Sequence, residues 1–116
     1  MTRKIALALG LTVALSGAAA AHHGWGSYDA KKPVTVNGKV LTSRYENPHV
    51  ALTVQAADKV WTVTLAPTSR MTSRGALAEM VAVGRTISAY GYPSTAQSDE
   101  IRAERITVDG KTIEMR

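Results

Sequence analysis

The sequence has 116 residues, of which 14 are basic, 9 are acidic and none is cysteine. The lack of cysteine excludes disulfides, thiolate metal sites, thiol nucleophiles and a lipid-modified cysteine. Basic residues are scattered, and Lys31–Lys32 is the only adjacent pair after Lys4. Binding to a phosphate backbone requires a clustered basic stripe, so we expect no role in nucleic-acid binding.

The first residues have the order of a secretory signal peptide. Arg3 and Lys4 give a positive start, Ile5–Leu15 is apolar, and small residues follow as far as Ala21. Signal peptidase accepts only small side chains just before the cleaved bond. A transmembrane anchor is the weaker interpretation, because the apolar run is at the lower limit of length and contains glycine, serine and threonine. We expect residues 1–21 to be removed and the protein to be periplasmic, soluble and without a membrane anchor.

The cleavage site has two possible positions, after Ala20 or after Ala21, because both satisfy the small-residue rule. Cleavage after Ala21 would leave 12 basic and 9 acidic side chains, a net charge of +3. The remainder is long enough for one small domain with a modest core.

Strand patterns dominate the mature sequence. Residues 22–33 lack periodicity and are expected to form an extended arm. From Val34 to about Tyr45, apolar and polar residues alternate as in a half-buried strand. Gly38 inside this strand predicts a bulge or a sharp bend. Asn47-Pro48 predicts the following turn.

Two further strands are expected directly after this turn. Apolar residues alternate from Val50 to Val54 and again from Trp61 to Leu65, with a tight reversal at residues 57–59. The three strands predict a meander. Trp61 shares the phase of the apolar residues after it, so we expect it in the core.

Residues 68–80 form the one plausible helical stretch. Thr68 or Ser69 is the expected cap, and Gly75 is expected to split or kink the helix. The predicted buried side chains are Met71, Leu77 and Met80.

The closing part predicts two strands and a hairpin. Residues 86–92 form the fourth expected strand, and residues 101–108 form the fifth. The apolar phase changes between Ala103 and Ile106, which predicts a bulge. Asp109-Gly110 is a strong two-residue hairpin signal that returns a short last strand.

Three strands, a helix and two strands is the order of the oligonucleotide/oligosaccharide-binding barrel, the OB-fold. We therefore predict an all-β domain with little helix, a five-stranded OB-like barrel over residues 34–116. The alternative is a small antiparallel sandwich or an open sheet.

The sequence resembles an uncharacterised family of small exported bacterial proteins, a domain of unknown function. The resemblance rests on the opening His22-His23-Gly24-Trp25, the turn Asn47-Pro48-His49, and a closing segment around Arg102–Ile106 and Asp109–Lys111. It implies export and an OB-like shape, and it brings no established activity.

All three histidines lie in the first two of these motifs. Imidazole is a common ligand of copper, zinc and nickel, and the chain has no competing thiolate. If the mature chain begins at His22, its amine and imidazole could chelate Cu(II) together. If it begins at Ala21, the amine, two amides and His23 could form a square-planar site. We predict a metal site, with Cu(II) the preferred ion, formed by His22, His23 and His49. The alternatives are a polar cleavage junction and a turn histidine bonded to the backbone.

A second, metal-free hypothesis rests on tyrosines. Tyr90 and Tyr92 share a face, and together with Tyr45 they could bind an envelope protein, a peptide or a glycan through a stacking platform. We expect the tyrosine pair instead to pack beneath the arm or the terminal hairpin.

No enzyme pattern is present. Asp99-Glu100 and Glu104 have no histidine near them in sequence, and no serine lies in a nucleophile elbow. A copper monooxygenase would also need a broader substrate surface than a domain of this size offers. We therefore expect a non-enzymatic binding protein.

Overall fold

The computed structural model describes residues 24–116, so His22 and His23 lie outside the described residues. It contains six strands, one short α-helix and two 3-10 turns. The strands are β1 (Val34–Arg44), β2 (Ala51–Gln55), β3 (Val60–Thr64), β4 (Thr86–Pro93), β5 (Glu100–Val108) and β6 (Lys111–Glu114). The helical segments are η1 (Trp25–Ser27), α2 (Thr68–Ser73) and η2 (Ala78–Val81).

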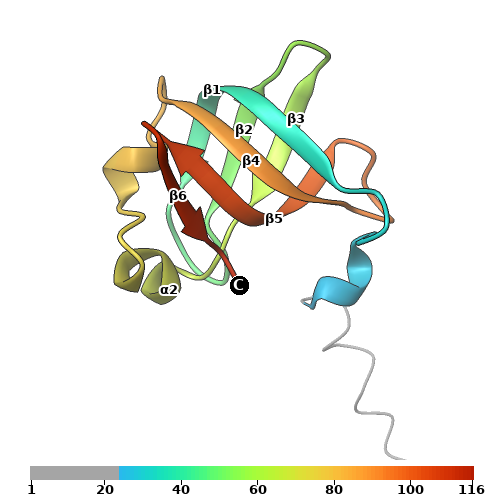
Figure 1. Cartoon of the computed structure of the whole chain (residues 1–116), viewed down its shortest axis with the longest axis horizontal. Coiled ribbons are helices and arrows are strands. Elements are labelled where there is room, and N and C mark those ends of the chain that lie inside the picture. Colours follow the sequence, from blue (N-terminus) through green and yellow to red (C-terminus); the bar gives the residue numbers. More distant parts are fainter. Residues whose placement is uncertain (1–23) are drawn as a thin grey trace, which may run out of the picture.

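Five of the strands close into a barrel, as predicted. The strand order is β3-β2-β1-β4-β5-β6, and an additional parallel pairing of β3 with β5 closes the ring (Figure 1). All other pairings of the described strands are antiparallel. The sixth strand, β6, lies beyond the ring, where it pairs with β5. The OB-like, all-β prediction is confirmed.

The first strand is long because it belongs to both halves of the barrel. Its residues Val34–Lys39 pair with β4, and its residues Lys39–Arg44 pair with β2. Gly38 lies at this change of partner, where an added Cβ would collide with the main-chain carbonyl of Gln55. The predicted bend is therefore confirmed. The register shift itself lies between Val40 and Thr42.

The core is built from the alternating apolar residues of the strands. Trp61 is 9% exposed, which confirms its predicted core position, and its Nε1 donates to Asp58 Oδ1. Full burial of each aliphatic side chain stabilises the fold by about 1.5–3 kcal/mol relative to exposure. The largest fully buried side chains are Leu52, Leu65, Met71, Ile87, Ile101, Ile106 and Met115.

The helical stretch is divided, as Gly75 predicted. The α-helix ends at Ser73, Gly75 has a φ of +83°, and a separate 3-10 turn comes after it. Met71 is fully buried, and Met80 packs partly against the core. The prediction for Leu77 is wrong, because this side chain is 43% exposed. The α-helix ends at Ser73, and even an unbroken helix would turn Leu77 about 120° away from Met71 over six residues.

The cap of α2 also differs from the prediction. Neither Thr68 nor Ser69 caps the helix, which begins directly after Pro67. Instead, Asn47 Oδ1 accepts hydrogen bonds from Thr68 N at 3.1 Å and from Thr68 Oγ1 at 2.9 Å. The cap thus comes from the loop between β1 and β2, which fixes that loop against the helix.

The terminal hairpin has the predicted bulge and turn. Tyr90 pairs with Arg105 and Gly91 with Ala103, so Glu104 is the extra residue of β5. Asp109 and Gly110 have φ values of 50° and 76°, as a two-residue hairpin turn with positive φ at both positions requires. Along residues 24–116 no helix has the length and apolar character needed to cross a bilayer.

We predict that Gly38→Ala lowers the free energy of unfolding by about 2 kcal/mol or more, because β1 and β2 would have to separate to admit the methyl group. Gly26→Ala is the matched control, since a Cβ at Gly26 meets no atom within 4 Å. Its effect should stay below about 0.5 kcal/mol. Urea unfolding measures both values, and equal midpoints for the two variants would contradict the close crossing of the strands.

Candidate functional site

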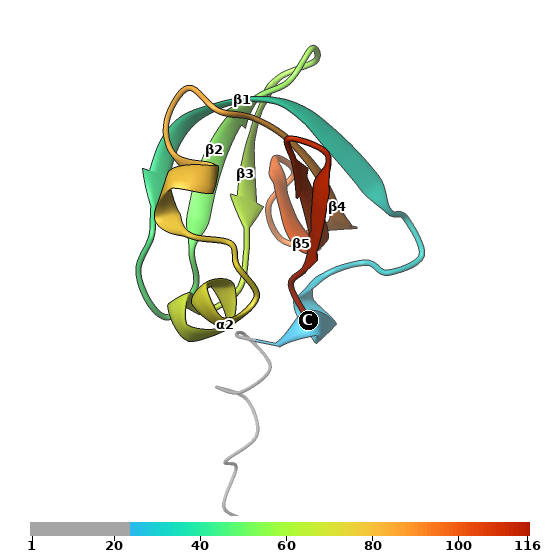
Figure 2. The same ribbon diagram turned by 60° about the vertical axis from the view of Figure 1, so that its left-hand side comes forward.

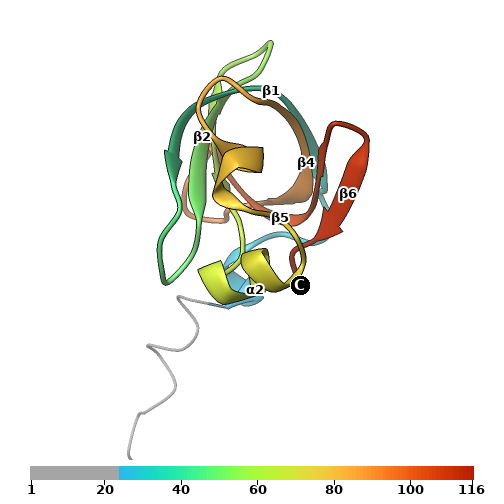
Figure 3. The same cartoon turned by 90° about the vertical axis from the view of Figure 1, so that its left-hand side faces the viewer.

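Four segments meet at one end of the barrel, which we call the α2 end. They are the arm (residues 24–33, beginning with η1), the β1–β2 loop (residues 45–50), α2, and residues 115–116. In both Figure 2 and Figure 3 the first turn of the arm (η1), α2 and the C-terminal residue lie toward the lower end of the barrel. The α2 end therefore brings together the two ends of the described chain and the loop that carries His49.

Polar and ring contacts connect these segments one to the next. The loop is bound to α2 through Asn47 and Thr68. From α2, Arg70 Nη1 donates to the main-chain oxygen of Met115 at 3.1 Å. The guanidinium of Arg116 in turn lies over a ring of the arm. The segments thus form one connected unit.

The arm is held by its tryptophan. The Cζ atoms of Arg102 and Arg116 lie 4.5 Å and 4.4 Å from the centre of the Trp25 ring. The Tyr92 ring meets Trp25 edge-on, with centroids 6.0 Å apart. Each cation–π contact stabilises the bound arm by about 0.5–2 kcal/mol, with the larger value for desolvated groups such as the buried Arg102. The first described residues of the arm are therefore fixed on the outer face of β4 and β5.

A second anchor lies three residues further along the arm. Tyr28 donates its hydroxyl hydrogen to Glu100 Oε2 at 2.5 Å, and Thr64 Oγ1 donates to the same oxygen at 3.0 Å. Burial, together with the neighbouring Glu100, raises the pKa of Tyr28 to about 12. Main-chain hydrogen bonds from Asp29 N to Pro93 O and from Thr95 N to Ser27 O complete the attachment.

The structure places one of the three predicted metal ligands. His49 is half-buried in the β1–β2 loop, at the α2 end, whereas His22 and His23 precede the first described residue. Within residues 24–116 no group of three His, Asp or Glu side chains is arranged to hold a metal.

The three predicted tyrosines do not form one patch. Tyr90 pairs with Thr35 near the start of β1, and Tyr45 lies just past the end of that strand, ten residues later. Tyr45 packs against the core and donates its hydroxyl to Ala76 O at 2.6 Å. Tyr90 and Tyr92 do form a pair, with centroids 6.1 Å apart.

The expected packing of this tyrosine pair is confirmed. Trp25 of the arm covers Tyr92. Arg105, which is ion-paired to Glu114 of the hairpin, lies over Tyr90 at 4.8 Å. The pair thus supports the arm and the hairpin rather than presenting a stacking platform.

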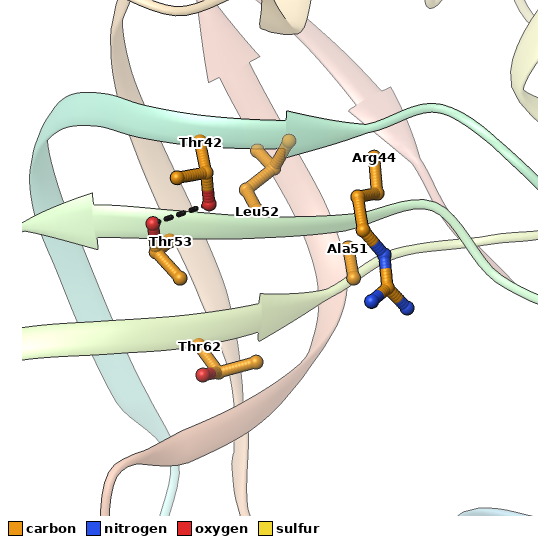
Figure 4. A pocket seen from close by; sticks show the side chains of 6 residues that line it. All are labelled: Thr42, Arg44, Ala51, Leu52, Thr53 and Thr62. Atoms are coloured by element: carbon orange, nitrogen blue, oxygen red, sulfur yellow. Dashed lines mark hydrogen bonds between the residues drawn. The ribbon is translucent and has the colours of Figure 1, made fainter.

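A shallow hollow of about 240 Å³ lies on the outer face of β1, β2 and β3 (Figure 4). It is lined by Thr42, Arg44, Ala51, Leu52, Thr53 and Thr62. Thr42 and Thr53 share a hydrogen bond of 2.6 Å between their hydroxyls. The Arg44 side chain extends beyond Ala51 at the rim and is ion-paired to Glu46. Hydroxyl groups and one guanidinium suit a polar ligand.

Comparison with known proteins identifies the family. Residues 10–102 match the model of a family of unknown function, DUF6152. The chain belongs to this family. The DUF6152 match covers both histidine motifs, and it ends at Arg102, before most of the closing segment on which the resemblance also rested. No curated protein matches this DUF6152 chain.

Among solved structures, the DUF6152 chain is similar to the crystal structure of the ZRD-deleted mutant of TiaS in complex with agmatine. The sequence identity is 17% and the TM-score is 0.54. The match covers 75% of this chain and 27% of the TiaS chain, so the protein corresponds to about a quarter of that structure. At this identity the likeness shows the fold alone.

Sequence reasoning missed the arginines that hold the arm. The period-2 pattern of β5 does place Arg102 on its outer face, but that pattern does not show that Trp25 covers it. Arg102 is 6% exposed, and it is the one buried charged residue among residues 24–116. An outward-facing arginine in a strand, combined with a tryptophan in a polar arm, was the available signal.

We predict that Tyr28→Phe removes a pH-dependent part of the stability. The pKa of Tyr28 is raised in the fold from 10.0, so the contribution of the neutral hydroxyl is complete below pH 10 and is lost as the pH rises through 12. The variant should lose about 1 kcal/mol at neutral pH, allowing for partial exposure. Its free energy of unfolding should then fall less steeply from pH 10 to 12 than that of the wild type.

Tyr92→Phe is the control for this prediction, because Tyr92 contacts its aromatic neighbours through its ring rather than its hydroxyl. It should keep the wild-type slope. Identical slopes for Tyr28→Phe and wild type would show that the Glu100 contact does not favour the neutral phenol.

Proposed function

We propose that the protein is a non-enzymatic periplasmic binding protein that holds a transition-metal ion, with Cu(II) preferred. The ligands are His22 and His23 of the mature N-terminus and His49 of the β1–β2 loop. The observation that carries this proposal is the attachment of the arm at Trp25, at the end of the barrel that also carries the β1–β2 loop.

The attachment limits how far the first histidines can lie from the barrel. Two residues of chain reach at most about 7 Å, and His22 precedes Gly24 by two residues. The arm is fixed from Trp25 onward by two guanidinium groups and one ring. A short tether from a fixed point, at the end of the barrel that also carries the half-buried His49, favours one shared site over two separate ones.

The ligand chemistry favours copper. A terminal amine, backbone amides and imidazoles are nitrogen donors, and tetragonal nitrogen ligation is typical of Cu(II) and Ni(II). Cu(II) has the highest affinity among the divalent ions of this series. No thiolate competes for the ion, because the chain contains no cysteine.

The competing function is a metal-free interaction module for an envelope protein, a peptide or a glycan. The hollow on β1–β3 supports it better than the tyrosines do, since Tyr45 lies apart from the tyrosine pair. The three threonine hydroxyls and Arg44 offer hydrogen bonds to the hydroxyl or acidic groups of a glycan.

We predict that one equivalent of Cu(II) raises the thermal midpoint of the mature protein at pH 7 and has no effect near pH 5. Protons compete with the metal for every imidazole and amine, and an ordinary histidine titrates near 6.5. At a free copper concentration of about 100 Kd the stabilisation is about 2.7 kcal/mol. His49→Ala should abolish most of the rise, and His22→Ala together with His23→Ala should do the same.

Glu46→Gln is the matched control, because it changes the same loop without removing an imidazole, and it should retain the copper effect. A rise that survives His49→Ala would confine the metal to the arm. If copper produces no shift at any pH, the metal function fails and the interaction module becomes the better proposal.

We predict that the periplasmic fraction yields a mature chain that begins at His22 or at Ala21, as read by intact mass. A start at His22 favours chelation by the terminal amine and its own imidazole. A start at Ala21 favours the site formed by the amine, two amides and His23. A chain that keeps residues 1–21 would exclude both geometries that use the terminal amine.

A further inference from the structure

One edge of β1 is left unpaired where the strand changes partners. Its first part pairs with β4 from Val34 to Lys39, whereas its pairing with β2 begins only at Lys39. Among the strands that the structure describes, none pairs with the other edge of Val34–Asn37. The bend at Gly38 therefore opens a gap, which we call the wedge, between this edge and the turn that joins β2 to β3.

The main-chain groups of two residues in β1 face the wedge. Val40 N donates to Arg85 O at 2.8 Å, so the main chain of Val40 faces the side of β4. An antiparallel pair exchanges hydrogen bonds at every second residue, and the register with β4 is regular along this part of β1. Thr35 and Asn37 therefore direct their N–H and C=O groups away from β4, into the wedge.

The wedge has a volume of about 270 Å³. It lies at the end of the barrel opposite α2, where the turn between β2 and β3 projects (Figure 1, Figure 2). This volume is smaller than the roughly 300–1,000 Å³ of pockets that enclose a whole small molecule, and it suits one or two side chains of an extended chain. The lining residues are Val34, Thr35, Asn37, Ala56, Ala57, Asp58 and Trp61.

The wedge combines apolar surface with one negative charge. Val34 and Trp61 both pack in the core. Asp58 is the one charged residue in the lining, and its Oδ1 accepts a hydrogen bond from Trp61 Nε1 at 3.2 Å. This hydrogen bond is the main reason that the pKa of Asp58 is lowered, so the carboxylate is charged at neutral pH. Lys59 is held outside the lining, since its Nζ donates to Ser98 O of the loop between β4 and β5.

The free edge lacks the usual protection against strand pairing. Natural proteins protect exposed edges with charged side chains, proline, bulges or a covering segment. Residues Val34–Asn37 include no charged side chain and no proline, and Thr35 and Asn37 are exposed. An edge of this composition is a template for an added strand.

We propose that the edge Val34–Asn37 binds an extended peptide segment of a partner protein by strand addition, with an apolar side chain of the peptide against Trp61 and a basic one at Asp58. In this mode, main-chain hydrogen bonds provide affinity and pockets for alternate side chains provide specificity. The turn between β2 and β3 walls the wedge on its far side, so a single extended chain fits and the edge of a second folded barrel does not. The site is separate from the proposed metal ligands and from the hollow on β1–β3, and it requires neither.

The test titrates the mature protein with an acetylated and amidated pentapeptide of alternating valine and lysine. A chelator is present at pH 7, so that a failure of the copper proposal does not affect the result. The amide resonances of Thr35 and Asn37 and the indole N–H resonance of Trp61 should shift together, with a Kd of about 1 mM or tighter. Amide hydrogen exchange of Thr35 and Asn37 should slow in the complex, because both N–H groups become hydrogen-bonded.

The same pentapeptide with N-methylated main-chain nitrogens should bind about tenfold more weakly or worse, since it lacks the N–H donors. Thr35→Pro should abolish binding, because proline has no N–H and its ring covers the edge. The thermal midpoint should stay unchanged, since the Thr35 N–H does not pair with β4 and an edge accepts proline.

Thr35→Ala is the matched control, because it keeps the N–H group, and it should bind like the wild type. Asp58→Asn keeps the acceptor for Trp61 Nε1 and removes only the charge. It should weaken binding of the lysine peptide about two- to fivefold.

Unchanged affinity for the N-methylated peptide, or unchanged binding by Thr35→Pro, would overturn the proposal. Resonance shifts confined to other surfaces, or no shifts at all, would do the same. If Thr35→Pro does not fold, the N-methylated peptide still decides. A dimer of the free protein that Thr35→Pro converts to a monomer, as measured by sedimentation, would assign the edge to a second copy and overturn the peptide site.

Discussion

Glu100 lies where β5 meets β3, and its backbone and its carboxylate have separate tasks. Its backbone pairs in parallel with Thr62, in the one parallel pairing that closes the described barrel. Its Oε2 accepts hydrogen bonds from Thr64 of the barrel and from Tyr28 of the arm. A charged acceptor of this kind stabilises by about 1.5–3 kcal/mol for each well-made bond. The attachment of the arm thus depends on the same residue as the closure of the sheet, and the geometry of the α2 end depends on both.

This dependence explains why the α2 end combines segments that are distant in sequence. The barrel sets the positions of Tyr92 and Arg102 on neighbouring strands, and these positions decide where Trp25 can bind. Asn47 serves as a link in the same way, since its side chain supplies the cap that α2 does not provide for itself. Polar and ring contacts between these segments, together with the core packing of Met71 and Met115, therefore hold the candidate site together.

Local periodicity and turn chemistry account for the features that the sequence predicted correctly. The strand order, the bend at Gly38, the bulge at Glu104 and the Asp109-Gly110 turn are confirmed, because a period of two and a positive φ are local properties. The contacts that form the α2 end are not local. Trp25 and Arg116 lie near opposite ends of the described sequence but contact each other in the fold, and no spacing rule predicts such a pair. Tyr45 lies apart from Tyr90 and Tyr92. The sequence does not reveal this separation, because residue types do not give distances along a bent strand. Leu77 is exposed because it lies beyond the end of α2, in a segment to which the helical period does not apply.

The binding place of Trp25 also imposes an order on folding. Its ring contacts Tyr92, Arg102 and Arg116, and the ribosome synthesises all three residues well after the arm. Because a chain is made from its N-terminus, the arm has no complete surface to bind until β4, β5 and the residues after β6 are present. Docking of the arm is therefore among the last steps of folding, since it joins the most widely separated parts of the described chain. The same contacts are the first to be lost when the terminal segments fray, so the barrel can remain closed while its arm opens and rebinds.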